Sequence, residues 1–314
     1  MLNIKPSCWS ETDTLKTVIV CPPSILDVRD QQTAEDVLWE KPVNQKRATE
    51  NHARLCRALE DAGVQVINYA KYLSVEDFHM NEQLLNRIYV RDLACVFGET
   101  ILPGEAGISM RQPEYIHAHR LFKKWYEEPF KAEANNGLKA LEFGDVMILN
   151  RDVVLINVGM RTSILSIEQV KGEIFKAGFS EIAIIDLPRR SDTLHTDMNL
   201  NLAGENMILS KCYLRYLPVL TMTEKASKHE MLHNLLKRHG FETHWTSKVT
   251  DSLADINFLN LDPETILISK QRRKSIFKDH PKLKKLKCIE VNVTELEKGG
   301  GGIRCMTLPL RRET

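Results

Sequence analysis

The 314-residue sequence lacks long hydrophobic runs and lacks an excess of charge of either sign. No apolar stretch approaches the roughly 20 residues that a helix needs to cross a bilayer, and the N-terminal MLNIKPSCWSETD carries a proline and charges where a signal peptide is apolar. Lysine and arginine number 43 and aspartate and glutamate 42, a formal net charge of +1. We therefore expect a cytoplasmic globular protein with no membrane or nucleic-acid partner.

The seven cysteines include no Cys-x-x-Cys pair. An odd number without paired spacing fits neither a disulfide framework nor a zinc site, and it favours a reducing compartment. Six cysteines lie in apolar runs or at strand edges, where we expect packing roles: Cys8, Cys21, Cys56, Cys95, Cys212 and Cys288. The seventh, Cys305, follows the four glycines of GGGGIRCM.

A repeat of about fifty residues runs through the chain. Four segments share an aspartate, an apolar strand, a polar turn and a second apolar strand; they are RDLACVFGETILPG, GDVMILNRDVVLINVG, TDMNLNLAGENMILS and ADINFLNLDPETILIS. Their leading residues, with Cys305 as a fifth, are 53, 52, 58 and 50 positions apart: Asp92, Asp145, Asp197, Asp255 and Cys305. The first unit comprises LKTVIVCPP and a helix through Leu55 and Leu59.

Helical patterns separate the hairpins. Glycines at 63, 178 and 240 suit the left-handed ends of three helices, one of which can begin at Thr162 or Ser163. The β-rich runs VQVINY, FSEIAIIDLP and FETHW follow these glycines. Because such units cannot bury their apolar faces alone, we expect five of them to close around an axis as one α/β domain over residues 1–314.

A closed ring would bring the corresponding residues of the units to one central site. His195 lies two residues before Asp197, and alternation along a strand would place both side chains on one face. An imidazole and the Cys305 thiol at the same centre would form a nucleophile with its acid/base partner. The four glycines before Cys305 would let the backbone approach a ligand closely.

The acidic residues predict the charge of the substrate. Four carboxylates near the thiol would raise its pKa and oppose thiolate formation; they are Asp92, Glu142, Asp145 and Asp197. Such a site favours a small cationic substrate. A guanidinium or amidine fits best, because its planar fork of N–H groups matches carboxylates.

Five segments in order resemble the signature of the guanidino-group-modifying, or pentein, superfamily; they are YVRD, LEFGD, VGMRTS, LHTD and GGGGIRCM. That superfamily includes arginine deiminase, dimethylarginine dimethylaminohydrolase and glycine amidinotransferase, and the resemblance runs from about residue 14 to the C-terminus. It implies a five-bladed, pseudo-symmetric α/β-propeller without metal or cofactor. It also implies Cys305 as nucleophile, His195 as general acid/base and Glu142 as a third catalytic residue. Four residues would bind substrate: Asp92, Asp145 and Asp197 at the guanidinium, and Arg161 at a carboxylate.

Two sequence segments depart from the family pattern. Phe143 stands in LEFGD where the family usually has glycine, which predicts a tighter or more apolar loop beside the guanidinium. The sequence NVGMRT differs from the usual wording around Arg161, where a substrate carboxylate would bind. The resemblance therefore predicts the type of reaction better than it predicts the substrate.

The implied reaction is hydrolysis of a guanidino compound such as arginine or a methylarginine. A covalent thiouronium on Cys305 would give a ureido product plus ammonia or an amine. Two alternatives remain open: an amidinotransferase that uses the same intermediate, and a non-catalytic binding protein on the same fold. The sequence also leaves a homo-oligomeric state open.

A competing motif is HEMLH at residues 229–233, which matches the H-E-x-x-H of zinc proteases. The longer metzincin pattern needs a glycine where Leu236 stands. In a continuous helix, His239 would lie about 15 Å along the axis from His229, too far to chelate the same ion. We therefore predict that HEMLH forms an exposed helix face.

Four further features have local interpretations. We predict that His117 and His119 lie in a surface loop, and that Asp255 forms a hairpin turn or accepts from N–H groups. The stretches 28–45 and 103–113 are the two candidates for a lid over the site.

Overall fold

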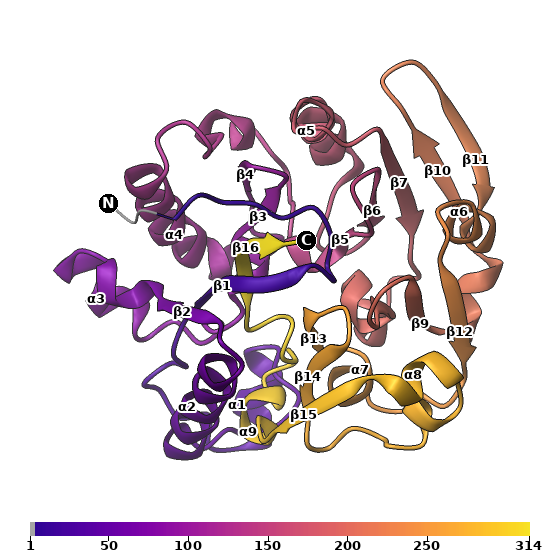
Figure 1. The fold of residues 1–314 in the computed structure, drawn as a ribbon. Helices are drawn as coiled ribbons and strands as arrows, with labels where there is room; N and C mark the ends of the chain where they lie inside the picture. The colour runs from indigo at the N-terminus through magenta and orange to yellow at the C-terminus, as the bar shows by residue number, and fades with distance from the viewer. Residues whose placement is uncertain (1–3) are drawn as a thin grey trace.

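The predicted unit recurs in the computed structural model, which describes residues 4–314. Residues 1–3 of the predicted domain and of the MLNIKPSCWSETD segment lie outside the described residues. The fold is α/β, and its strands form five separate sheets that do not hydrogen-bond into one closed barrel. Figure 1 shows α2, α4, α5, α6 and α8 at the periphery and most of the strands further in.

The first unit joins the two ends of the chain. In it, β1 (Thr14–Val20) pairs antiparallel with β16 (Leu308–Glu313) and parallel with β2 (Gln65–Asn68). Helix α2 (Gln45–Asp61) connects β1 to β2. The antiparallel hairpin of this unit is therefore assembled from strands almost 300 residues apart.

The second and third units follow the same plan. The second consists of β3 (Ala94–Phe97), β4 (Thr100–Pro103) and α4 (Gln112–Trp125). Its third strand is reduced to one parallel bridge between Ile101 and Phe130. The third consists of β5 (Val146–Ile148), β6 (Val153–Val158), α5 (Ile164–Lys176) and β7 (Glu181–Asp186), with β6 and β7 parallel.

The fourth and fifth units complete the set. The fourth consists of β8 (Leu200–Leu202), β9 (Met207–Lys211), α6 (Leu232–Arg238) and β12 (Glu242–Thr246). The fifth consists of β13 (Leu259–Asp262), β14 (Thr265–Ser269), α8 (Pro281–Lys285) and β15 (Lys287–Val291). In both, the hairpin is antiparallel and the third strand parallel, so the predicted hairpins and β-rich runs are confirmed.

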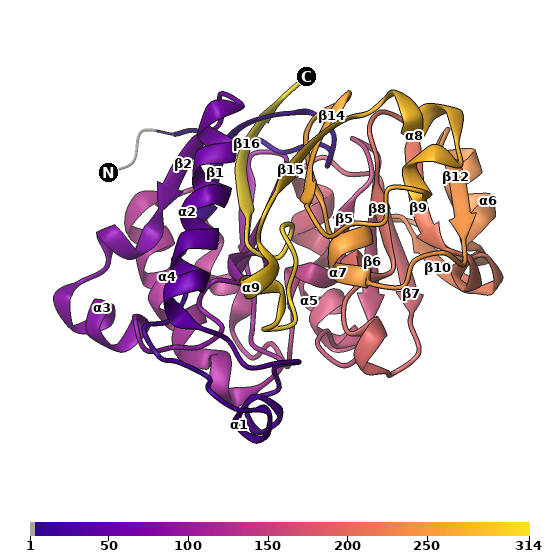
Figure 2. The same ribbon diagram turned by 90° about the horizontal axis from the view of Figure 1, so that it is seen from below.

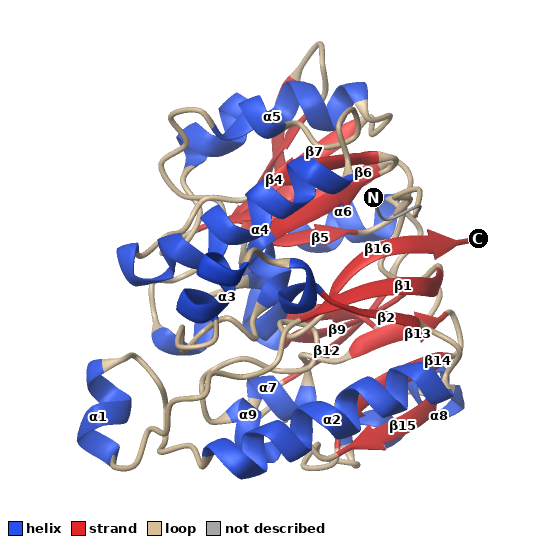
Figure 3. Cartoon of the chain, turned by 90° about the vertical axis from the view of Figure 1, so that its left-hand side faces the viewer, coloured by secondary structure: helices blue, strands red, loops and turns tan. Residues whose placement is uncertain are grey.

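In the described part of the chain, shorter helices lie within and between these units. Four are α-helical: α1 (Gln31–Asp36), α3 (Val75–Asn81), α7 (Ser252–Asp255) and α9 (Thr294–Glu297). Nine are 3-10 helices: Tyr69–Tyr72, Val90–Leu93, Ser109–Arg111, Ala132–Asn135, Phe143–Asp145, Ser191–Thr193, Thr196–Met198, Cys212–Tyr216 and Ile276–Lys278. Figures 2 and 3 show α1 projecting away from the sheets on two connecting loops.

The predicted helix ends are confirmed. Gly63, Gly178 and Gly240 have φ angles of +80°, +113° and +81°, a region that favours glycine because it has no Cβ. Ser163 caps α5 by accepting a hydrogen bond from the backbone N–H of Leu165.

A fourth-unit insertion overturns the prediction for HEMLH. Strands β10 (Pro218–Met222) and β11 (Ser227–Met231) form a hairpin that extends the sheet of the third unit beyond β7. His229 therefore pairs with Leu220 in a strand, whereas His233 lies in α6. The helical interpretation was wrong because pairing with β10 cannot be read from the local apolar spacing.

The histidines at 117 and 119 also differ from expectation. Both lie in α4 rather than in a surface loop, and His117 is buried. The ring Nε2 of His119 lies 2.9 Å from the carbonyl oxygen of Leu93. The prediction was wrong because residues 112–125 form a helix whose buried face includes His117.

The hydrophobic core is divided into five clusters, each shared by two units. Units one and five share the cluster that contains Leu55 and Leu267; units one and two share that of Ile19 and Phe122. The remaining clusters join units two and three, three and four, and four and five. Every unit therefore buries apolar surface against two neighbours, which supplies the burial that one unit alone cannot.

All seven cysteines lie among the described residues and are free thiols. Among the described helices, none has the length and apolar character needed to cross a membrane.

Candidate active site

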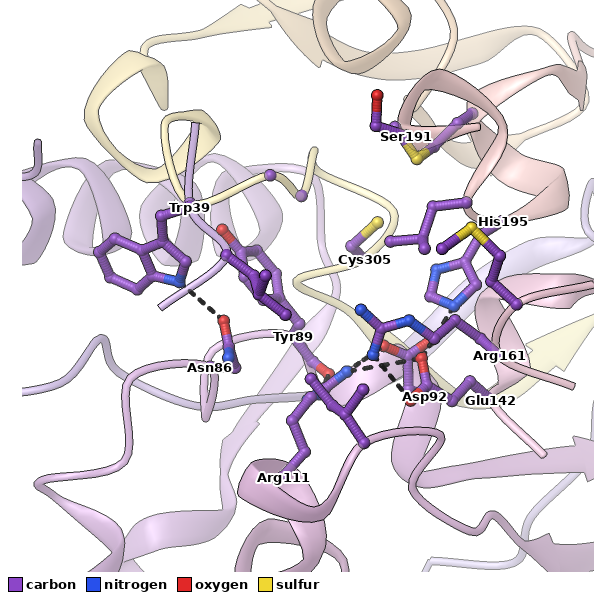
Figure 4. A pocket seen from close by; sticks show the side chains of 18 of the residues that line it. Trp39, Asn86, Tyr89, Asp92, Arg111, Glu142, Arg161, Ser191, His195 and Cys305 are labelled. Carbon is purple, nitrogen blue, oxygen red and sulfur yellow. Dashed lines mark hydrogen bonds and ion pairs between the residues drawn. The ribbon is translucent and has the colours of Figure 1, made fainter. Parts of the chain in front are cut away.

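A cavity of about 440 Å³ brings together five of the residues singled out from the sequence. Its walls include Cys305, His195, Glu142, Asp92 and Arg161. Figure 4 shows Cys305 and His195 on the same side of this cavity, with Asp92 and Glu142 beneath them in the view. The thiol and the imidazole, which are 110 positions apart, therefore face one space.

The repeat explains why these side chains converge. Asp92 lies in the 3-10 helix that precedes β3, Glu142 caps the one that precedes β5, and His195 caps the one that precedes β8. Cys305 lies in the turn 303–306 that precedes β16. Each residue thus stands just ahead of the hairpin of a different unit.

Asp197 is not among the residues that line the cavity, and its predicted role in substrate binding stays a prediction. Its Oδ2 accepts a hydrogen bond from Arg304 Nη1 at 2.9 Å and lies 3.6 Å from Cys305 Sγ. Residues 196–198 form a 3-10 helix rather than a strand, so the expected alternation with His195 does not apply. Asp197 therefore lies behind the thiol, where it contacts protein groups.

Asp145 is also absent from the residues that line the cavity, and its predicted role in substrate binding stays a prediction. Its Oδ1 accepts from Asn157 Nδ2 at 2.7 Å and from the backbone N–H of Thr196 at 3.3 Å. Burial raises the pKa of Asp145 to about 7. Glu142 and Asp145 flank a single 3-10 turn, which sends only the first of them into the cavity.

His195 is held by carboxylates. Its Nε2 lies 2.9 Å from Glu142 Oε2. Burial acts to lower the pKa of His195, but the charges of Asp92, Asp145 and Glu142 outweigh it and raise this pKa to about 10. The imidazole is therefore protonated at neutral pH and can act first as a general acid.

Whereas the surroundings of His195 favour its charged form, those of the Cys305 thiol disfavour its charged form, the thiolate. Burial raises the pKa of Cys305 well above its usual value, and the nearby charges of Asp197 and Asp92 raise it further. A backbone hydrogen bond from Gly302 and the charge of Arg304 act in the other direction. Because burial and the nearby acids both disfavour the thiolate, a positive charge added to the cavity would favour it.

Two arginines already contact the carboxylates of the cavity. Arg111 Nη1 donates to Asp92 Oδ2 at 2.7 Å and lies 4.0 Å from Glu142 Oε2. Arg161 Nη1 lies 3.6 Å from Glu142 Oε1, which also accepts from the backbone N–H of Gly107. Asp92 and Glu142 are therefore arranged so that guanidinium groups can approach them.

The same group of residues bears on metal binding. Asp92, Glu142 and His195 place potential ligand atoms within 4.8 Å of one another. Arg111 is buried, and a second ion pair to Glu114 at 2.9 Å helps fix it beside Asp92. A metal ion bound there would have to compete with this fixed cation for the carboxylate of Asp92.

Glycines allow the close approaches at this site. A Cβ on Gly144 would lie 2.6 Å from His195 Nδ1 and 2.9 Å from Asp92 Oδ1. A Cβ on Gly299 or Gly301 would collide with the ring of Tyr89, and one on Gly302 would lie 2.7 Å from Asn257 Oδ1. The four-glycine run thus packs against side chains, as well as bordering the cavity.

Phe143, predicted to make the loop beside the carboxylates tighter or more apolar, lies in the core. Its side chain is buried in the hydrophobic cluster between units two and three, where it stacks edge-on against Phe97. Phe143 therefore contributes to the core and is not among the residues that line the cavity.

Sequence reasoning missed three polar residues near the reacting groups. Arg111 lines the cavity within the 103–113 stretch, Asn257 Nδ2 lies 3.2 Å from Cys305 Sγ, and Arg304 joins Asp197 to Glu11. The only sequence signal for Asn257 was its place two residues after a leading aspartate, an offset that Asn199 shares. Nothing local identified Arg111.

Asp255 acts as predicted, as an acceptor for backbone N–H groups. Its Oδ2 accepts from Thr250 and Asp251, and its Oδ1 accepts from Arg273. Both stretches named as lid candidates reach the cavity: the first contributes Glu35 and Leu38 to Glu40, and the second contributes Ile108 and Arg111.

Comparison with known proteins agrees with this arrangement. The family model for arginine deiminase matches residues 68–312. The chain is 25% identical over 310 residues to the uncharacterised protein YkgA of Bacillus subtilis (strain 168), covering 98% of this chain and 96% of YkgA. It is 25% identical over 261 residues to the arginine deiminase of Borreliella afzelii, covering 73% of this chain and 61% of that protein. The chain therefore spans less than two thirds of the second relative.

Solved structures share the fold at lower identity. A dimethylarginine dimethylaminohydrolase from Pseudomonas aeruginosa, complexed with citrulline, has a TM-score of 0.66 at 17% identity, covering 94% of this chain and 99% of that one. The amidinotransferase SxtG of Microseira wollei also has a TM-score of 0.66 at 17% identity, covering 99% and 98%. Together with the match over residues 68–312, these findings show that the chain belongs to the arginine deiminase family, within the pentein superfamily of guanidino-group-modifying proteins.

Proposed function

We propose that this protein is a cysteine-dependent hydrolase of a small guanidino compound, with Cys305 as nucleophile and His195 as general acid and base. One observation carries the proposal: Cys305 and His195 line the same cavity as two carboxylates that already contact guanidinium groups. The product would be a ureido compound plus ammonia or an amine.

We further propose that the five units form a closed five-bladed α/β-propeller as a single domain. The shared hydrophobic clusters support this, because they connect each unit to the next and the fifth to the first. The free state of all seven cysteines supports a cytoplasmic location.

In the first half-reaction, the guanidinium charge favours loss of the Cys305 proton to solvent. The thiolate attacks the central carbon while Asp92 and Glu142 hold the nitrogen edges. His195 then gives a proton to the departing nitrogen, so that ammonia or an amine leaves and a cationic thiouronium remains on sulfur. The charge balances: the guanidinium, the thiolate and the imidazolium together carry one positive charge, and so does the thiouronium formed beside a neutral imidazole and a neutral leaving group.

In the second half-reaction, neutral His195 takes a proton from an incoming water. The resulting C–O bond forms as the C–S bond breaks, which returns the thiolate and releases the neutral ureido product. The remaining water proton ends on the released ammonia or amine. Water and one guanidinium are thus consumed for one ureido compound and one ammonium.

The test is to incubate the protein with arginine, methylarginines, agmatine and simple alkylguanidines and to assay ureido product. Intact mass would reveal an adduct, and Cys305→Ser and Cys288→Ser are matched variants, since Cys288 lies outside the cavity. We expect product from the wild type and from Cys288→Ser but not from Cys305→Ser. Full activity of Cys305→Ser would overturn the proposal, and an adduct without ureido product would point to amidino transfer instead.

A further inference from the structure

Asn257 contacts Cys305 through both ends of its side-chain amide. Its Nδ2 lies 3.2 Å from Cys305 Sγ, and its Oδ1 accepts a hydrogen bond from the backbone N–H of Cys305 at 3.2 Å. Asn257 is buried and lies between α7 and β13 of the fifth unit. The residue therefore holds both the backbone and the sulfur of the proposed nucleophile.

The hydrogen bonds determine which way the amide faces. Oδ1 meets the N–H of Cys305, and Nδ2 also donates to the carbonyl oxygen of Asp197 at 3.2 Å. In the flipped orientation, the amide N–H₂ would face another N–H, and the amide oxygen would face a carbonyl oxygen. Only the orientation that points an N–H at the sulfur satisfies these buried groups.

The sulfur needs a donor because its other polar neighbour is an acid. Asp197 Oδ2, 3.6 Å from Sγ, can accept the thiol hydrogen but repels a thiolate. The Nδ2 hydrogen of Asn257 has the opposite preference, since a thiolate accepts hydrogen bonds more strongly than a thiol. When Cys305 ionises, the sulfur would therefore lose its hydrogen bond to Asp197 and strengthen the one from Asn257, without movement of the backbone.

Close packing keeps Asn257 in this position. A Cβ on Gly302 would lie 2.7 Å from both Cβ and Oδ1 of Asn257, so a larger residue at 302 would displace the amide. Asn201 Nδ2 donates to the carbonyl oxygens of Ile256 and Phe258, each at 2.8 Å, and so fixes the backbone on both sides of Asn257.

We propose that Asn257 is a positioning residue that donates a hydrogen bond to the Cys305 thiolate and holds the sulfur in line with the substrate carbon. The proposal rests on the proposed function only in taking Cys305 as the nucleophile. It goes beyond that function because it gives a neutral side-chain amide of the fifth unit, that of Asn257, a role in activating the thiol.

The experiment measures how fast iodoacetamide alkylates Cys305 between pH 6 and 10, with peptide mass mapping to separate this site from the other cysteines. The variants are Asn257→Ala, which removes both contacts, and Asn257→Asp, which keeps an acceptor for the Cys305 N–H. Asn201→Ser is the matched control, because it loosens the same segment without touching the sulfur.

We expect both Asn257 variants to move the alkylation profile to higher pH and to react at least tenfold more slowly at neutral pH. Their kcat on a guanidino substrate should fall by a similar factor while KM changes little. Asn201→Ser should lower the unfolding temperature and move the alkylation profile less than either Asn257 variant, because it keeps the Asn257 amide itself. Unchanged profiles in the Asn257 variants, or an equal shift in Asn201→Ser, would overturn the proposal.

If Asn257→Asp does not fold, Gly302→Ala gives an independent test, because the added methyl group displaces the Asn257 amide. It should shift the profile in the same direction. Failure of the proposed function has a different signature: Cys305→Ser would retain ureido formation, whatever the alkylation profiles show. The two proposals therefore fail on different measurements.

Discussion

The base of the cavity and its mouth are built in different ways. At the base, Asp92, Glu142, His195 and Cys305 are buried and stand ahead of repeated hairpins. At the mouth, Leu38 and Met160 are 63% and 51% exposed and belong to connecting loops outside the repeat. The repeat therefore fixes the groups that contact the reacting carbon, whereas the loops decide what else a substrate must carry.

The mouth combines apolar and acidic groups. Leu38, Trp39 and Met160 line it together with Glu35 and Glu40. The indole N–H of Trp39 donates to Asn86 Oδ1 at 2.8 Å, which anchors this segment to the body of the protein. Because α1 stands apart from the sheets (Figure 3), the segment it carries can differ between relatives without disturbing the base.

The largest loss of activity should come from removing the nucleophile at the base of the cavity. We expect Cys305→Ala to lower kcat by at least about three powers of ten, because no other group can form the covalent intermediate. Steady-state assays of ureido product measure this, and circular dichroism checks that the variant is folded. Residual activity within tenfold of wild type would mean that Cys305 is not the nucleophile.

The charge on His195 gives a second, pH-dependent effect. Since the pKa of His195 is raised to about 10 in the folded protein, its contribution to stability is complete below about pH 6.5, the usual value, and declines as the pH rises towards 10. We expect the advantage of wild type over His195→Gln in urea unfolding to shrink across this range. An advantage that grew with pH would show that the imidazole is neutral when folded.

A variant of Arg161 can distinguish binding of the guanidinium at the base of the cavity from binding of the rest of the substrate at its mouth. We expect Arg161→Gln to raise KM about tenfold or more for substrates that carry a carboxylate, and to change KM little for agmatine or alkylguanidines, which lack one. Kinetics on matched pairs of substrates measure the difference. Equal losses on both kinds of substrate would place Arg161 with the base, through its contact with Glu142.

The smallest effect concerns the mouth alone. Leu38 has a φ of +63° at the end of α1, where its N–H donates to Glu35 O and the N–H of Trp39 donates to Ala34 O. Glycine is the usual residue in this position, so Leu38→Gly should stabilise the protein by about 0.5–1 kcal/mol. Thermal unfolding tests this, and a rise in KM of a few-fold at constant kcat would show that the leucine contacts substrate.

The sequence predicted the repeat and most of the convergence. Alternating apolar residues and glycine stops specify each hairpin and helix end locally, so the α/β fold could be inferred before the strands were paired. Asp92 and Cys305 hold leading places in the units, and His195 precedes a leading aspartate by two residues. Glu142 was identified by the family resemblance, and the leading residues Asp145 and Asp197 are not among those that line the cavity.

The remaining features depend on contacts between distant segments. The β10–β11 hairpin exists because β10 pairs with β7, a contact that local spacing around His229 does not encode. Asp145 and Asp92 occupy equivalent places, yet only Asp92 meets an arginine, supplied by a loop almost twenty residues later. Asn257 could not be assigned because its role depends on how closely Gly302 packs against it.

The pairing of β1 with β16 has a consequence for when the protein becomes active. Cys305 stands only three residues before β16, and its turn is held in place by a strand that must dock beside the strand nearest the other end of the chain. During synthesis Cys305 follows the other cavity residues, and we expect the nucleophile to be placed only when β16 docks beside β1. Turnover in a refolding experiment should consequently report the docking of this final strand, and it should lag behind the burial of the earlier hairpins.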